Sequence, residues 1–429
     1  MKALLVLLLL QQPEPTPAQV VREHADKALK AEDLEAANVL YSIAAWMKDE
    51  EAAKAEKEVA DKLRAATAFK RATLDLSALT DSPWDALVAT IPSKTKAART
   101  APGGILINFD GEKITLKGTS VSRKRERPGE FDLERFFITS DDEILLIDKS
   151  SAKVIERKPP GGLGGKLLKA ADTPTLVAGE MLFQVRSVIR ALQRLNDHRR
   201  AAGQAPAAFS AEISYGAFLH ARYLVFEDRS NVQGMAVHNE VPGKWSSDEG
   251  AIAGRRSDIS LVNLDASIDQ LMATLYHRIP LIAPELKSVG IGTWENGGTF
   301  YSVIDITGGK GTRDTKTPFM YPGDGQVKVP RVFAVGETPD PRPQGLKENV
   351  GYPITITGAA PDAIGELKEE KGGVVECFVS SSKAPANPAR PDNADSICLL
   401  PKKALKANTK YVVTVKYGDS SWTWSFTTK

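Results

Sequence analysis

Apolar and polar residues alternate along the chain with a spacing that changes from region to region, and each spacing predicts a different kind of element. From Gln19 to about residue 70, alanine, glutamate, lysine and leucine predominate, and apolar residues recur every three to four positions. Because that is the period of one helix face, the segment predicts two or three helices. Between residues 101 and 160 the apolar runs are shorter, and GILINFDGEKITLKG is typical of a hairpin that turns at Asp110-Gly111. We therefore expect a helical region at residues 19–70 and a small β-rich region at 71–160.

Helical spacing returns after a linker, rich in glycine, that we expect at residues 161–181. A first amphipathic helix starts near residue 185, a second carries His220 on its apolar face, and a third is predicted from near Asp265 to just before Pro280. The segments SVGIGTW and TFYSVIDIT then predict two strands joined by a turn. Helices against a short antiparallel sheet indicate a layered domain of α and β elements, which we expect at residues 182–325.

The last hundred residues contain short strands separated by proline, glycine and asparagine. PITITG, VVECFVSSS, SICLLP, YVVTVKYG and SWTWSFTT are spaced as in a β-sandwich, so residues 326–429 predict an immunoglobulin-like or fibronectin-III-like module. Trp422 and Trp424 fall on one face of the last strand. If exposed, they would suit a structural scaffold or carbohydrate binding, and burial would remove that support. The chain as a whole is expected to belong to the α+β class.

The first residues, MKALLVLLLLQQPEPTPA, have the layout of an export signal. Lys2 gives a positive start, and the apolar run Ala3–Leu10 is shorter than the roughly 20 residues that span a bilayer. We expect a signal peptide at residues 1–18 and a secreted or periplasmic protein with no transmembrane segment after its removal. A net charge of +2 gives no reason to expect nucleic acid as a partner.

Two cysteines, Cys377 and Cys398, lie near the C-terminus, and their spacing does not indicate structural zinc. In an oxidising compartment a disulfide between them is one expectation, and closing a loop of about 20 residues would add about 3 kcal/mol of stability. Two buried free thiols are the alternative.

Three of the five histidines lie in the third region, close to acidic residues. His238 and Glu240 stand in the irregular segment VHNEVPGKWSSDEGAIAGRRSD, which also holds Glu249, and His277 lies near the end of the third predicted helix. A metal needs converging imidazole or carboxylate ligands, and general acid–base chemistry needs a titratable pair in one cleft. These four residues could meet if the irregular segment folds back over the third helix.

An ordered series of motifs resembles the CAP superfamily, named after cysteine-rich secretory proteins, antigen 5 and pathogenesis-related proteins. The series is LQRLNDHRRAAG, SYGAFLHARYL, MAVHNE, DEGAIAG and LMATLYHRIPLIAPELKSVGIG, and the likeness is greatest to secreted bacterial members. It covers about a third of the chain, from Leu182 to Gly309. The resemblance implies an α-β-α sandwich with a central cleft that holds two histidines and two acidic residues and binds a divalent metal in several members.

Position by position, His238 and His277 resemble the two cleft histidines, and Glu249 resembles the glutamate of the family's Gly-Glu-Asn motif. The asparagine of that motif is replaced by Gly250. The family's second acidic residue has no evident equivalent, because Thr274 stands about where it should be. Glu240 is the residue that could substitute for it. The resemblance thus implies a candidate site for zinc, calcium or magnesium made of His238, His277, Glu249 and Glu240.

The leading functional interpretation is a secreted binding module whose ligand is an unknown protein, lipid or component of the cell envelope. The first alternative is a peptidase-like hydrolase that uses His238, His277 and Glu249, either with a metal-activated water or with Ser257 as nucleophile. Ser257 lacks the GxSxG context of a nucleophile elbow, and a helix cap or turn is its alternative role. We expect Ser257 and His220 to line the cleft, with a hydrogen-bonded core position as the alternative for His220, which lies on an apolar helix face. The second alternative is an envelope-associated scaffold.

Overall fold

The structure is a computed structural model. It describes residues 15–79, the backbone of six strands between residues 105 and 158, and residues 181–429 apart from short gaps at 183, 228–233, 244, 297–298, 313–317, 334–335, 359–362, 387, 389–392 and 394–395. The expected signal peptide lies almost wholly outside the described residues, as does the expected linker. Among the residues that are described, no helix combines the length and the apolar character that crossing a bilayer requires.

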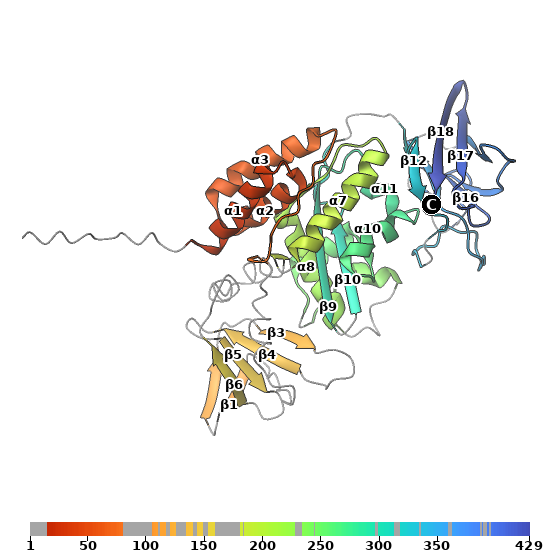
Figure 1. The fold of residues 1–429 in the computed structure, drawn as a ribbon. Coiled ribbons are helices and arrows are strands. Elements are labelled where there is room, and N and C mark those ends of the chain that lie inside the picture. The colour runs from red at the N-terminus through yellow and green to blue at the C-terminus, as the bar shows by residue number, and fades with distance from the viewer. Residues whose placement is uncertain are drawn as a thin grey trace, which may run out of the picture.

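Three helices form the N-terminal region, as the periodicity predicts: α1 (Pro17–Lys30), α2 (Leu34–Trp46) and α3 (Glu50–Ala65). Their first turns are capped by Thr16, Asp33 and Asp49, whose side-chain oxygens each accept a hydrogen bond from a backbone N–H three residues on. Helix α2 is buried along almost its whole length because α1 and α3 cover one side and the central domain covers the other (Figure 1).

Polar side chains on α2 bind the edge of the central domain. The Asn38 side-chain oxygen accepts a hydrogen bond from the N–H of Phe209, 2.6 Å away, and the Ser42 hydroxyl accepts one from Ala211, 2.8 Å away. These N–H groups lie on and just after a short edge strand, where they would otherwise be buried without partners. The N-terminal helices are therefore packed onto the central domain through α2.

Six strands follow in the described parts of residues 105–158. Strands β1 (Ile105–Phe109) and β2 (Glu112–Leu116) pair antiparallel across Asp110-Gly111, which confirms the predicted hairpin. A second, antiparallel sheet has the order β3-β4-β5-β6, and its strands are β3 (Val121–Arg125), β4 (Glu134–Thr139), β5 (Ile144–Asp148) and β6 (Lys153–Lys158).

The central domain places helices on both faces of a four-stranded sheet of order β7-β9-β10-β8. The strands are β7 (Ala208–Phe209), β8 (Ser257–Ser260), β9 (Ser288–Asn296) and β10 (Thr299–Asp305). The helices are α7 (Val185–Ala201), α8 (Ala211–Phe226), the 3-10 turn η2 (Gly234–His238), α9 (Asp248–Arg256), α10 (Leu264–Met272) and α11 (Arg278–Leu281). Helix α8 approaches β9 closely at Gly290 and Gly292, where a Cβ would collide with the α8 backbone. The layering is the α-β-α order that the resemblance implies.

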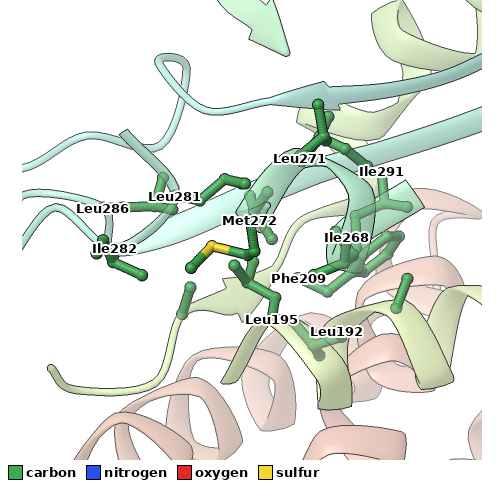
Figure 2. Packing of buried hydrophobic residues seen from close by; sticks show 14 of the residues in the cluster. Leu192, Leu195, Phe209, Ile268, Leu271, Met272, Leu281, Ile282, Leu286 and Ile291 are labelled. Carbon is green, nitrogen blue, oxygen red and sulfur yellow. The ribbon is translucent and has the colours of Figure 1, made fainter. Parts of the chain in front are cut away.

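On the other face of the sheet, α7 and α10 pack through apolar side chains. Leu192 and Leu195 of α7 meet Ile268 and Met272 of α10, with Ile291 of β9 reaching the same cluster (Figure 2). Because successive residues of a strand point to opposite faces, the sequence Gly290-Ile291-Gly292 gives β9 one bare face for α8 and one apolar face for α7 and α10.

The third predicted helix is interrupted, and this corrects the expectation of one helix from Asp265 to Pro280. Helix α10 ends at Met272, and α11 begins at Arg278 with His277 as its N-terminal cap position. The backbone N–H groups of the intervening turn donate to the carboxylate of Glu337, a residue from a distant part of the chain. That carboxylate satisfies groups that a continuous helix would have bonded internally.

Two four-stranded sheets form the C-terminal region, with orders β11-β13-β16-β15 and β12-β18-β17-β14. Their strands are β11 (Phe319–Tyr321), β12 (Gln326–Val329), β13 (Ile354–Thr357), β14 (Ile364–Glu369), β15 (Cys377–Ser380), β16 (Ser396–Pro401), β17 (Lys410–Tyr417) and β18 (Ser420–Thr428). Because β11 pairs with β13, these sheets include residues ahead of the expected boundary at 326. An immunoglobulin-like or fibronectin-III-like relationship stays a prediction. Trp424 is buried and Trp422 packs against the core, which removes the support that exposed tryptophans would have given to a scaffold or carbohydrate-binding surface.

Arg278 connects the central and C-terminal regions. Its guanidinium is fully buried, donates to the carbonyl oxygens of Met272 (2.8 Å) and Pro353 (2.6 Å), and stacks near the rings of Tyr321 and Tyr352. A buried cation is tolerated only with such partners. The two regions are thus held together through polar as well as apolar contacts.

The two cysteines are free thiols in the structure, so the expected disulfide is not formed. They lie on the neighbouring strands β15 and β16, but Cys377 is opposite Pro401 and Cys398 is opposite Ser380. A register offset of three residues separates their Cα atoms by about 10 Å along the strands, beyond the roughly 7 Å that a disulfide can bridge.

Candidate functional site

A cavity of about 350 Å³ opens where the central domain meets the C-terminal region. Its walls come from η2, from β8 and β10, from the turn before α11 and from a segment of the C-terminal region. The residues that line it are Gly234, Met235, Val237, His238, Ile259, Leu261, His277, Tyr301, Gly336 and Thr338. Most of these side chains are apolar, and the ionisable groups among the described lining residues are the imidazoles of His238 and His277 and the phenol of Tyr301.

His238 is held in one orientation by the backbone. Its Nδ1 atom lies 3.0 Å from the carbonyl oxygen of Gly254, and because a carbonyl can only accept, Nδ1 carries the proton. Burial lowers the pKa of His238, and the charges of His277 and His220 lower it further, against the effect of the Gly254 carbonyl. The ring is therefore neutral at pH 7, and Nε2 is the nitrogen it has left for a ligand.

His277 has the opposite charge preference. Its Nδ1 atom lies 3.1 Å from Oε1 of Glu337 and 3.4 Å from the hydroxyl of Thr274. Burial opposes the charged form, but the hydrogen bond to Glu337 and the negative charges of Asp258 and Glu337 outweigh it and raise the pKa of His277 to about 9. His277 is thus an imidazolium at pH 7, and its Nε2–H is available as a hydrogen-bond donor.

Asp258 is a residue of β8, is almost fully buried, and is close enough to His277 for the two charges to interact. One of its carboxylate oxygens has no hydrogen-bond partner among the described residues. Burial raises the pKa of Asp258 to about 7, although the positive charge of His277 acts in the other direction. The carboxyl group of Asp258 is therefore only partly ionised close to pH 7.

His220 and Glu240 pair with each other away from the cavity lining. Nδ1 of His220 lies 2.9 Å from Oε1 of Glu240, and its Nε2 donates to the carbonyl oxygen of Val237 at 2.7 Å. The second carboxylate oxygen of Glu240 accepts from the N–H of Ser247 at 2.7 Å. This buried pair ties the segment that carries His238 to α8, so its role in this structure is to support the site.

Glu249 and Ser257 do not line the cavity either. Glu249 lies exposed in the first turn of α9. Ser257 is buried, and its hydroxyl donates to the carbonyl oxygen of Ala253 at 2.7 Å. Of the residues predicted for the site, the structure thus brings only His238 and His277 to one cavity.

The positions of these residues bear on the expected metal centre. Both imidazoles have Nδ1 fixed by an acceptor, as metal-bound histidines usually do, but a catalytic zinc site takes three protein ligands. Glu240 is occupied by His220 and Ser247, and Glu337 by three backbone N–H groups and His277. Within the described ranges, no three or more His, Cys, Asp or Glu side chains are grouped so as to hold an ion. In the described residues the four predicted ligands are therefore not gathered into one group, and divalent-metal binding stays a prediction.

Glu337 is one of the residues of the site that the sequence did not predict. It follows His277 by 60 positions in AVGETPDPRP, a segment with no periodicity and several prolines. Its carboxyl group is buried only because the C-terminal region folds back onto the end of α10. A search limited to the family motifs could not find it, since it lies beyond them.

Comparison with known families supports the resemblance of the central domain to the CAP superfamily. Residues 192–306 match the family model described as CAP, cysteine-rich secretory protein family. The central domain therefore belongs to the CAP superfamily, as its motifs predict. The match leaves out the N-terminal helices and the C-terminal sheets, and it ends before Glu337. Comparisons with curated proteins and with solved structures returned no match.

Proposed function

We propose that the protein is an extracytoplasmic binding module whose cavity takes a small ligand with an apolar body and one polar group that bonds to His238 and His277. The observation that carries the proposal is the pair of imidazoles, each fixed through Nδ1 and each with Nε2 left over, in one apolar cavity. Ligand sites of this kind combine apolar walls with a few oriented polar groups.

The walls support a ligand with an apolar body. Val237, Ile259 and Tyr301 line the interior, while Met235 and Leu261 stand at the rim with 51% and 62% of their surface exposed. Contact between these exposed apolar side chains and an apolar ligand would stabilise the complex, because it removes apolar surface of both from water.

The two imidazoles together favour a hydroxyl as the polar group. His277 offers an N–H donor and neutral His238 offers an acceptor, so an alcohol can accept from the first and donate to the second. A carboxylate can accept from His277, but it can bond to His238 only after that ring takes up a proton. The same cavity should therefore prefer an alcohol over the carboxylate of equal length.

The hydrolase alternative gains no support from this geometry, because Ser257 is engaged by Ala253 outside the cavity lining. Divalent-metal binding stays a prediction. The export signal also stays a prediction; we expect protein recovered outside the cytoplasm to begin close after Ala18, which mass spectrometry of its N-terminal peptide would check. A protein that retains residues 1–18 would contradict the extracytoplasmic part of the proposal.

The binding test uses the full chain and isothermal titration with octan-1-ol, octanoate, zinc, calcium and magnesium. We expect saturable binding of octan-1-ol that weakens at least about tenfold in His238→Ala and in His277→Ala, since each loses one oriented hydrogen bond. His24→Ala, on the remote helix α1, is the matched control and should bind as the wild type does. Octanoate should bind more weakly, with a heat that depends on buffer ionisation because a proton is taken up.

Absence of octan-1-ol binding, or binding that both histidine variants retain, would contradict the proposed site. Saturable metal binding that is lost in the same variants would instead favour the metal-dependent alternatives.

A further inference from the structure

One segment of the C-terminal region forms part of the cavity. Gly336 and Thr338 line it, and the side chain of Glu337 between them is fully buried. The segment lies outside the part of the chain that matches the CAP family, which ends at residue 306. The cavity is therefore completed by a region beyond the part of the chain that matches the CAP family model.

A single carboxylate joins this segment to the turn between α10 and α11. Oε2 of Glu337 accepts from the N–H of Leu275 at 2.9 Å, and Oε1 accepts from the N–H groups of Tyr276 (2.6 Å) and His277 (3.2 Å). Oε1 also lies 3.1 Å from Nδ1 of His277. Both the backbone and the ring of His277 are thus fixed by one group, so the direction of Nε2 depends on Glu337.

Apolar contacts on either side keep the segment in place. Leu275, Tyr276 and Ile279 form one buried cluster with residues of the C-terminal region, namely Phe333, Val350, Cys398 and Leu400. Arg278 adds its hydrogen bond to Pro353 next to that cluster. Any displacement of the C-terminal region would move Glu337 and the cavity wall together.

We propose that the segment Gly336–Thr338 determines the ligand specificity of the cavity, with Thr338 as a wall and Glu337 as the positioning residue for His277. This inference rests on the proposed function, because it concerns the same cavity. The C-terminal region is then part of the binding site. Ligand binding should stabilise the packing of that region against the CAP domain, and that packing should in turn strengthen ligand binding.

The test uses three variants of the full chain: Glu337→Gln, Thr338→Phe and Glu376→Gln. Glu376 is an exposed glutamate of the same region, so its variant controls for loss of a charge. Hydrogen exchange at the amides of residues 275–277 reports the positioning role without any ligand. We expect exchange there to accelerate on the order of tenfold in Glu337→Gln and to stay unchanged in the other two.

Titration with octan-1-ol and octanoate reports the specificity role. Thr338→Phe should weaken octan-1-ol binding at least about tenfold by narrowing the cavity. Glu337→Gln should reduce the preference for octan-1-ol over octanoate. Unchanged exchange in Glu337→Gln would contradict the role of Glu337 in positioning His277. Binding of octan-1-ol by Thr338→Phe with wild-type affinity would contradict the role of Thr338 as a wall of the cavity. If the wild type binds neither probe, the proposed function and the specificity role both fail, while accelerated exchange in Glu337→Gln would still uphold the positioning role.

Discussion

Nδ1 of His220 lies 2.9 Å from Oε1 of Glu240, and both side chains are almost completely buried. The histidine comes from α8, and the glutamate comes from the segment between η2 and α9. With the bonds from His220 to Val237 and from Ser247 to Glu240, this pair fixes the strip of backbone that carries His238. One wall of the cavity therefore depends on a buried pair that does not itself line it.

Removing the carboxylate of that pair should destabilise the protein. In Glu240→Ala, the imidazole of His220 and the N–H of Ser247 are left buried without an acceptor, and breaking one side of a buried pair costs about 3–5 kcal/mol of unfolding free energy. Urea denaturation followed by tryptophan fluorescence would measure the change. Glu249→Ala, nine residues on and exposed, is the control and should change the free energy by less than about 1 kcal/mol. Equal effects of the two substitutions would show that the pair is not a stabilising element.

A methyl group at position 254 should also destabilise the protein. A Cβ on Gly254 would lie 2.5 Å from Cε1 of His220 and 2.8 Å from the carbonyl oxygen of His238, so α9 and α8 could not keep their separation. Overpacking of this kind costs about 1–3 kcal/mol, and we expect Gly254→Ala to lose that much in thermal or urea unfolding. Gly373→Ala meets nothing within 4 Å and should behave as the wild type. A neutral Gly254→Ala would mean that the two helices can separate without cost.

Asp258 should make stability depend on pH in one direction. Its folded-state pKa of about 7 lies above the unfolded value of about 3.9, so the folded protein binds more protons between these values and loses stability as pH rises from about 4 to about 7. Asp258→Asn has no such ionisation. We expect the variant to be more stable than the wild type by on the order of 4 kcal/mol at pH 8 and about equal to it below pH 4. A difference that grows toward low pH would contradict this assignment.

The cysteines should be reduced and unreactive in the native protein. Burial raises the pKa of the Cys377 and Cys398 thiols to about 12, so little thiolate is present to react. A disulfide reagent that reports released thiolate should react slowly at pH 8 and should count two thiols once the protein is unfolded in denaturant without reductant. No thiols in the unfolded protein would show that a disulfide forms after all. A Cys377→Ser/Cys398→Ser double variant supplies the blank.

Local pattern was enough to predict much of the fold. The helical periodicity of α1, α2, α3, α7 and α8, the hairpin at Asp110-Gly111, and strands β9, β10, β17 and β18 are properties of neighbouring residues, and so is the ordered set of CAP motifs. The break between α10 and α11 could not be predicted in this way. The turn is satisfied by Glu337, and no residue near it in the sequence signals that partner.

The residues of the site also fall into those that the sequence predicted and those that only the folded structure brings together. The sequence by itself determined the order of the motifs, and through their resemblance to the CAP family it predicted that His238 and His277 face one cleft; both do line one cavity. Only the tertiary structure decided that Glu240 pairs with His220, that Glu249 faces solvent, and that Glu337 reaches His277 across 60 positions. The physical reason is that a buried carboxylate is placed by whichever donors the folded chain brings within hydrogen-bonding distance, and that choice depends on how separate regions pack rather than on the residues beside it.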